Sequence, residues 1–212
     1  MGIRRRPLLA LAAVGGAGLP GCSGTPQAAR FAMPAEGTRL VYRQRDTGSY
    51  GSGEQRVEIL VQSRLWQGRQ AVVFARAGGT AEVRDRDTQQ LLAVLGPQGQ
   101  PVLSYDPPLG VEPPIEVGRR GSTSSTMTTL GTGRTTAITL NYDIGAYESL
   151  TLPAGRFRVW VIRIDTPDGE QQQVWTSPEA GFVVKRSDRR TASHAQGAGT
   201  RELELVERVP PG

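Results

Sequence analysis

Short runs of alternating apolar and polar residues follow one another along most of the chain after Thr38. Leu40 and Tyr42 alternate with residues of the opposite face, and Val57 and Ile59 do so again after a glycine-rich turn. A period of two with one polar face is typical of half-exposed β-strands. No stretch has the period of an amphipathic helix. The pattern predicts about ten strands in an all-β, mostly antiparallel curved sheet that forms a barrel or half-barrel.

The densest part of this pattern runs from Leu150 to Arg186, where four apolar runs are separated by three turns. The turns lie at 153–155, 166–169 and 177–181, and each contains proline and glycine. Proline presets a negative φ, and glycine takes the left-handed conformation that closes a tight turn. This segment therefore predicts an antiparallel meander, around which the other strands are organised.

The longest strand of the meander is apolar on both faces. Odd positions from Phe157 to Val161 share one face, and even positions from Trp160 to Ile164 share the other. One face would pack the core, so the other predicts either burial under a loop or partner, or the wall of a ligand pocket. Core packing is the simpler interpretation of the aromatic residues. The candidate ligand or partner surface consists of Phe157, Val159, Trp160, Val161, Ile162 and Trp175.

Several other segments depart from the simple alternation. The run 81–86 is polar on both faces, which predicts an edge strand protected by charge. The run 106–114 contains four prolines, and because proline lacks an amide N–H we expect a crossover loop there. The serine- and threonine-rich run 122–130 predicts an exposed strand at most, and 89–95 fits either a strand or a short helix.

The amino terminus has the features of an export signal. Three arginines at 4–6 precede an apolar run at 8–14, and Leu19-Pro20-Gly21-Cys22 follows. The apolar run is too short for a stable transmembrane helix. Leu-x-Gly-Cys after such a run resembles the lipobox of bacterial lipoproteins. The resemblance implies that Cys22 is lipidated on sulfur, with acyl chains such as palmitate, and becomes the mature amino terminus.

This motif divides the chain into three parts. Residues 1–21 are the predicted signal peptide, 22–37 a tether rich in small and polar residues, and 38–212 a single β-barrel-like domain. Cys22 is the only cysteine, so no intramolecular disulfide can form. Buried acyl chains contribute about 0.8 kcal/mol per methylene, which would hold the protein at a membrane without a transmembrane helix.

The predicted signal peptide and the residue after Cys22 also indicate where the protein is located. Ser23 beside the lipidated position resembles the outer-membrane sorting signal of enteric bacteria, which implies an outer membrane lipoprotein facing the periplasm, with the inner membrane as the alternative. Arg5-Arg6 resembles a twin-arginine motif, and the export route stays open between that system and the general secretory one. Three of the arginines behind the formal net charge of +5 lie in the leader. The charge therefore gives no support to nucleic-acid binding.

Four motifs in the carboxy-terminal half occur in a characteristic order. They are Pro-x-x-x-Val-Gly at 113–118, Leu-Pro-Ala-Gly-x-Phe at 152–157, Trp-x-Ser-Pro-x-x-Gly at 175–181 and Glu-Leu at 202–205. In this order they resemble a family of uncharacterised bacterial envelope β-barrel lipoproteins. The resemblance implies a periplasmic barrel or half-barrel and no assigned activity. A looser resemblance, of architecture and location only, is to Lol-type half-barrels that carry lipids or lipoproteins between envelope membranes.

The sequence is poor in catalytic groups. His194 is the only histidine and lies in a polar loop, where we expect it to be solvated. With one histidine and one lipidated cysteine, metal sites built on nitrogen or sulfur are not expected, and no cofactor motif is present. Lys185 is the only lysine and has no partner serine in a nucleophile motif. Covalent catalysis therefore has no evident agent.

Charged residues give two further hypotheses. Asp143 with Glu148, and Asp165 with Asp168, could act as acid and base, although solvated loop charges explain them equally well. Arginine clusters at 119–120 and 186–190 could meet anionic headgroups, because guanidinium matches phosphate in a bidentate way, or could serve solubility alone.

These observations predict a lipid-anchored envelope protein of structural or interaction type, without catalytic activity. The alternative is a carrier or sensor of an apolar ligand, such as a lipid or a lipoprotein acyl chain, held in the barrel. A carboxylate-dependent hydrolase is the least favoured hypothesis. A cavity lined by Ile138, Leu140, Val159 and Val161 would favour the carrier, whereas a filled barrel would exclude it.

Overall fold

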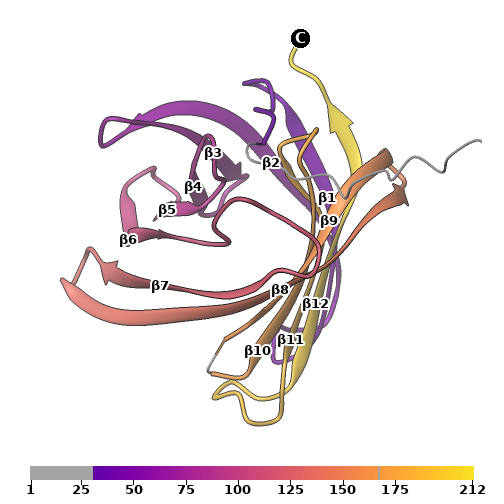
Figure 1. The fold of residues 1–212 in the computed structure, drawn as a ribbon. Helices are drawn as coiled ribbons and strands as arrows, with labels where there is room; N and C mark the ends of the chain where they lie inside the picture. Colours follow the sequence, from indigo (N-terminus) through magenta and orange to yellow (C-terminus); the bar gives the residue numbers. More distant parts are fainter. Residues whose placement is uncertain (1–30, 167) are drawn as a thin grey trace, which may run out of the picture.

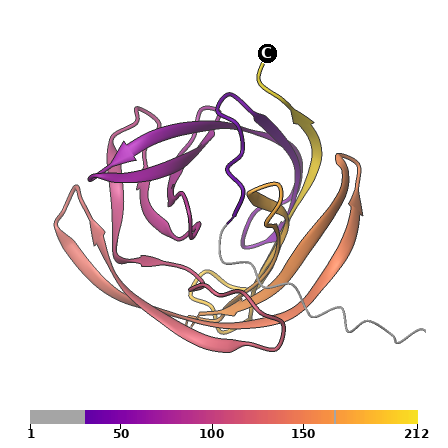
Figure 2. The ribbon, with the colours of Figure 1, turned by 45° about the horizontal axis from the view of Figure 1, so that its top comes forward.

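The fold is a single antiparallel sheet closed into a barrel, as the ribbon of a computed structural model shows (Figures 1 and 2). The structure describes residues 31–166 and 168–212. The strands are β1 (Arg39–Gly48), β2 (Gly53–Trp66), β3 (Arg69–Arg76), β4 (Ala81–Asp85), β5 (Leu91–Leu95), β6 (Pro101–Leu109), β7 (Arg120–Thr129), β8 (Arg134–Leu152), β9 (Gly155–Asp165), β10 (Glu170–Ser177), β11 (Phe182–Arg190) and β12 (Gly199–Val209).

The strand order around the barrel follows the chain, and β1 closes the ring by pairing with both β2 and β12. The all-β antiparallel barrel predicted from the alternating pattern is thus confirmed, with twelve strands where about ten were expected. The described residues contain no helix. The predicted signal peptide at 1–21, Cys22 and the first part of the tether lie outside the described residues.

The meander is present as β8 to β11, each strand pairing with the next. β8 carries a bulge at Gly145, where the register against β9 shifts between Ile144 and Ala146. Trp160 of β9 is fully buried, and its ring centroid lies 4.4 Å from that of Tyr147. A bulge bends its strand and sharpens the local twist, which here sits beside the largest buried side chain.

β4 is not an edge strand, contrary to the prediction. It pairs with β3 on one side and β5 on the other. Ala81 and Val83 are buried in an apolar cluster, while the intervening Glu82 and Arg84 belong to the opposite face of the strand. The charges of β4 do not protect an open edge, because closure of the barrel pairs this strand on both sides.

The proline-rich segment is partly strand, which corrects the expected crossover loop. β6 continues through Pro107 and Pro108 to Leu109, although its ladder with β7 stops at Asp106. The carbonyl of Pro107 instead accepts a hydrogen bond of 2.6 Å from the Ser125 hydroxyl. Because proline has no N–H to donate, the ladder ends there while the chain stays extended. The run 89–95 contains strand β5, not a helix.

The buried apolar residues form three separate clusters in place of one central core. The first centres on Leu40, Val61 and Leu205, the second on Val73 and Val83 of β3 and β4, and the third on Trp160. Side chains fill the interior of a barrel of about eight strands, and wider barrels leave space. A twelve-stranded ring with divided clusters therefore leaves room for a cavity.

Replacement of Trp160 by alanine should lower the free energy of unfolding by about 3–5 kcal/mol, because it opens a large void beside Tyr147. Trp175→Ala is the matched control, since Trp175 is only partly buried. Urea denaturation followed by circular dichroism measures both changes. Equal losses for the two variants would contradict the central packing role of Trp160.

Candidate functional site

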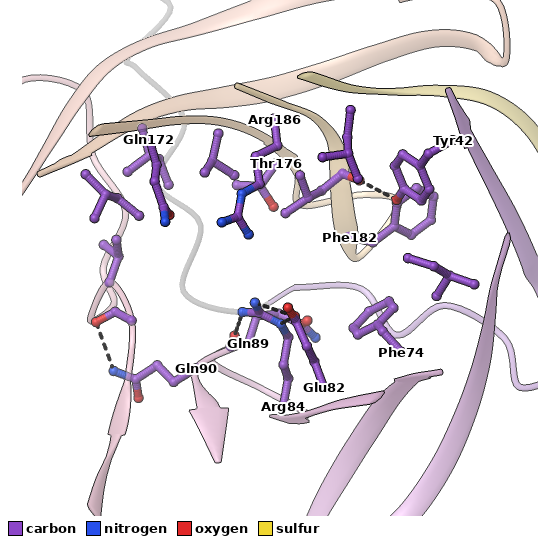
Figure 3. A pocket seen from close by; sticks show the side chains of 18 of the residues that line it. Tyr42, Phe74, Glu82, Arg84, Gln89, Gln90, Gln172, Thr176, Phe182 and Arg186 are labelled. Carbon is purple, nitrogen blue, oxygen red and sulfur yellow. Dashed lines mark hydrogen bonds and ion pairs between the residues drawn. The ribbon is translucent and has the colours of Figure 1, made fainter. Parts of the chain in front are cut away.

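A cavity of about 370 Å³ lies between β1 to β4 on one side and β9 to β12 on the other. Its walls combine three kinds of side chain, which Figure 3 shows in separate places. Aromatic residues gather at one end, two glutamines lie toward the other, and charged residues stand between them. The labelled members are Tyr42, Phe74 and Phe182 at the aromatic end, Gln90 and Gln172 toward the amide end, and Glu82, Arg84 and Arg186 between them, with Gln89 beside Arg84.

The aromatic end is preorganised by burial and one long-range hydrogen bond. Tyr42 of β1 donates its hydroxyl to the carbonyl of Val183 on β11, at 2.6 Å. Burial raises the pKa of the Tyr42 phenol, so this hydroxyl stays protonated and acts as a donor. Val57 and Ile59 of β2 extend the apolar surface beside it. This end suits an apolar group.

The charged wall on β4 consists of an ion pair held by its own strand. Nε and Nη2 of Arg84 lie 2.9 and 2.7 Å from Oε2 of Glu82. Nη1 of Arg84 donates to the Gln89 carbonyl at 2.8 Å. The neighbouring guanidinium of Arg84 lowers the pKa of the Glu82 carboxyl. Although enclosed by the barrel, the Glu82 side chain is 42% exposed, because it faces the hollow.

The turn after β4 places two glutamines at the cavity. Asp85 accepts hydrogen bonds from the amides of Asp87 and Thr88 at 3.0 and 2.9 Å, a local side-chain turn. Gln89 then adopts a positive φ of 60°, which directs the chain back into β5. Gln89 and Gln90 both line the cavity as a result.

The opposite charged wall is Arg186 of β11. Its Nε donates to Oδ1 of Asp188 at 2.7 Å, and the side chain of Asp188 is only 4% exposed. Burial raises the pKa of the Asp188 carboxyl, and the ion pair with Arg186 works against that effect. Figure 3 shows the guanidinium of Arg186 directed into the cavity, toward the wall that carries Glu82 and Arg84.

A third ion pair at the cavity joins the first and last strands. Arg201 of β12 donates through Nε and Nη2 to the two carboxylate oxygens of Asp46 on β1, at 2.8 and 3.0 Å. Gln44 adds a third hydrogen bond to Asp46, at 2.6 Å. The hydrogen bond from Arg201 is the main cause that lowers the pKa of the Asp46 carboxyl. This pair fixes Arg201, so its charge is already compensated.

Residues 31–38, named here the amino-terminal strap, run from the cavity to the start of β1. The amide of Ala32 donates to the Pro178 carbonyl at 2.7 Å, and that of Phe31 donates to the Asp87 carbonyl at 3.4 Å. These two carbonyls belong to the β10–β11 and β4–β5 turns, so the strap links turns from opposite walls. Phe31 itself lines the cavity. Residues 31–37, which the sequence placed in the tether, thus pack against the barrel.

Gly181 makes room for the strap. Its φ of +78° is unfavourable for other residues, and a Cβ there would lie 1.9 Å from the Ala32 carbonyl oxygen. The same Cβ would lie 2.8 Å from Cδ of Pro34. The final glycine of the Trp-x-Ser-Pro-x-x-Gly motif therefore serves both the turn and the close crossing of the strap.

The predicted candidate surface is divided by the structure. Ile162 lines the cavity together with its same-face neighbour Ile164. Five other candidates are absent from its wall: Phe157, Val159, Trp160, Val161 and Trp175. Ile138 and Leu140 are absent from it as well. The cavity therefore takes only one end of one face of β9.

The charged residues also lie differently from expectation. Arg186, grouped in the sequence with surface arginines, lines the cavity. His194 was expected to be solvated, yet its side chain is 9% exposed and its Nε2 lies 3.8 Å from Oδ2 of Asp168. None of the four carboxylates considered for acid and base work lines the cavity.

The sequence does not predict Glu82 and Arg84 as site residues, because a run that is polar on both faces, such as 81–86, is typical of an edge strand. Their alternation with Ala81 and Val83 was the available signal.

Within 31–166 and 168–212, no three residues of the metal-ligating types gather closely enough to hold a metal ion. The described part of the chain also has no helix suited to crossing a bilayer.

Solved structures that are similar to this chain include the following three proteins. A candidate exported protein with a YmcC-like fold from Bacteroides fragilis is 12% identical with a TM-score of 0.45, over 85% of this chain and 99% of that one. A candidate lipoprotein from Parabacteroides distasonis is 14% identical with a TM-score of 0.40, over 85% and 99%. The hypothetical lipoprotein YmcC from Escherichia coli is 16% identical with a TM-score of 0.43, over 85% and 91%.

No protein-family model matches the chain, and no curated protein matches it. At these identities and TM-scores the similarities support no conclusion about activity or ligand. Evidence on function therefore comes from the cavity and from the residues of this chain.

Gly181→Ala should destabilise the protein by about 1–3 kcal/mol through backbone strain, and by more because the methyl group meets the strap. It should also speed hydrogen exchange at the Ala32 amide. Gly133→Ala is the matched control, since Gly133 has a φ of +69° but open space around its Cβ. Thermal denaturation and exchange mass spectrometry measure both effects. Unchanged exchange at Ala32 in the Gly181 variant would show that the strap does not depend on this glycine.

Proposed function

We propose that this protein is a lipid-anchored component of the bacterial cell envelope that binds a small amphiphilic ligand inside its barrel, without catalysing a reaction. One observation carries the proposal: the barrel keeps a cavity of about 370 Å³ with an aromatic end and a charged, amide-rich end. Ligand pockets are usually apolar concavities of about 300–1,000 Å³ with a few placed polar groups. The cavity fits that description.

A purely structural role, which the sequence favoured, does not explain why the barrel keeps a cavity lined partly by charged side chains. A protein that only spans or braces the envelope is most stable with a filled core, because buried charges cost free energy unless they are paired. Here Glu82, Arg84 and Arg186 all face the hollow. The carrier or sensor hypothesis accounts for such a lining, because these groups would orient a bound ligand.

A non-catalytic role agrees with the residues at the cavity. Among the described residues, the wall holds no histidine, cysteine, lysine or serine, and its one carboxylate, Glu82, is engaged by Arg84. A hydrolase of the carboxylate type needs two carboxyl groups placed on either side of the substrate. A single engaged carboxylate does not meet that requirement.

The anchor would keep the cavity close to a membrane. Cys22 precedes Phe31 by nine residues, and a fully extended chain of that length spans about 30 Å. The strap holds Phe31 at the cavity. A lipid-derived ligand would then have a short path between bilayer and barrel. In this proposal the outer membrane is the site of anchoring, as Ser23 suggests, and the protein faces the periplasm.

Cys22→Ser should abolish lipidation and leave the precursor unprocessed, because serine lacks the thiol that accepts the acyl chain. Membrane fractionation with mass spectrometry of the mature amino terminus measures the change, and Ser23→Ala is a control that keeps the thiol. Processing and membrane association of Cys22→Ser identical to those of the wild type would refute the anchor. Separation of inner and outer membranes decides between the two locations.

Purified wild-type protein should bind the fluorescent amphiphile 1-anilinonaphthalene-8-sulfonate at one saturable site. Ile59→Trp should weaken this binding about tenfold or more, because the larger side chain fills the cavity that Ile59 lines. Leu60→Trp is the matched control, since Leu60 is 41% exposed and absent from the wall. Fluorescence titration in nanodiscs, with empty nanodiscs as the blank, measures the affinities. Equal affinities for both variants would rule out the cavity as the binding site.

A further inference from the structure

The cavity wall is unbalanced in charge. Arg76, Arg84, Arg186 and Arg201 line it, whereas Glu82 is the carboxylate among the described lining residues. Asp46 and Asp188, which partner two of these arginines, are absent from the wall. The surface that a ligand meets is therefore mainly cationic, and the compensating carboxylates stand behind it.

The four arginines differ in how many of their nitrogens are already used. Arg84 is bound through all three nitrogens, to Glu82 and to the Gln89 carbonyl. Arg201 is bound in a bidentate way to Asp46. These two guanidinium groups have little capacity for another anion. Arg76 is exposed at the end of β3, where solvent screens its charge.

Arg186 is the exception. Its Nε is bound to Asp188 at 2.7 Å, and neither terminal nitrogen has a hydrogen-bond acceptor within the described part of the chain. The bond to Asp188 fixes the guanidinium plane, and the side chain is directed into the cavity (Figure 3). Two parallel N–H donors on a fixed guanidinium match the two oxygens of a carboxylate or phosphate.

We infer that Arg186 selects the ligand, and that the ligand is an anionic amphiphile whose carboxylate or phosphate binds the free edge of this guanidinium while its apolar part lies toward Tyr42, Phe74 and Phe182. The inference rests on the proposed ligand-binding function and adds the chemical class of the ligand. Thr176 and Gln172, on β10 next to β11, also line the cavity and supply further hydrogen-bonding groups near the anion.

The negative charge of Glu82 limits how tightly the cavity binds an anion. Glu82 lies on the wall opposite Arg186 (Figure 3). Burial disfavours the charged form of Arg186, whereas the negative charges of Asp188 and, after it, Glu82 favour that form. A bound anion would meet the negative charge of Glu82 and be repelled by it. Neutralising Glu82 should therefore strengthen binding of anions, whereas neutralising Arg186 should weaken it. Opposite effects of two substitutions in one cavity are not the result expected from general misfolding.

The experiment compares four single-chain probes of equal length by isothermal titration calorimetry: decanoate, decyl phosphate, decanol and decyltrimethylammonium. The mature protein in nanodiscs is used, with empty nanodiscs as the blank. Both anions should bind at least about tenfold more tightly than decanol, since hydrogen bonds to charged groups are the strong ones. The cationic probe should bind most weakly. The ratio of the two anions distinguishes a carboxylate ligand from a phosphate ligand.

Arg186→Gln should remove the preference for both anions and leave decanol binding unchanged. Glu82→Gln should tighten anion binding several-fold. Arg189→Gln is the matched control, because Arg189 is exposed on the same strand and lies outside this cavity. Circular dichroism melting identifies a variant that fails to fold, and the Glu82 variant then still tests the inference.

The outcomes separate the inference from the function on which it rests. If no decyl probe binds the wild type, the proposed ligand-binding function fails. If decanol and the anions bind equally, and neither Arg186→Gln nor Glu82→Gln changes the anions' affinity, the cavity binds ligands but Arg186 does not select them. Weakened anion binding in Arg189→Gln equal to that in Arg186→Gln would place the anion outside the cavity.

Discussion

The antiparallel ladder between β1 and β12 is the constraint on which the rest of the structure depends. It runs from Arg39 opposite Val209 to Gly48 opposite Gly199, and it joins the two ends of the domain. At the Gly48 end of this ladder the backbone segments are so close that a Cβ on Gly48 would lie 2.4 Å from the Ala198 carbonyl oxygen. Closure at this ladder removes the exposed edges of the sheet and sets the width of the barrel.

The width of the barrel determines whether side chains fill its interior or leave it hollow. Twelve strands enclose more space than their side chains fill, and the apolar residues divide into clusters that leave a hollow. Charged residues on the hollow keep contact with water, which lowers the cost of enclosing them, and each buried carboxylate behind the wall has an arginine partner. In the same arrangement the two terminal nitrogens of Arg186 have no hydrogen-bond acceptor within the described part of the chain. The proposed binding function rests on this combination of incomplete packing and nearly complete charge pairing.

The strap connects this interior to the amino terminus. It crosses from the β4–β5 turn to the β10–β11 turn and needs the glycine at 181 to pass. The motif at 175–181, which the sequence predicts only as a turn, is thus also the place where the strap crosses, although the strap lies about 150 residues away in the sequence. If Cys22 carries the lipid, as proposed, the strap is the described segment nearest to the anchor in the sequence, and its Phe31 lines the cavity.

The sequence alone determined most of the strands, their antiparallel order in the meander and the two-faced character of β9, because these depend on local alternation and on turn residues. It did not predict the part of β6 that runs through Pro107 and Pro108. It could not determine closure, since the pairing of β1 with β12 joins residues more than 150 positions apart. For the same reason it could not place Glu82 and Arg186 in one cavity: each looked like a surface charge on its own strand. Only the curvature of the closed sheet brings the two strands to face each other, and the site exists through that long-range pairing.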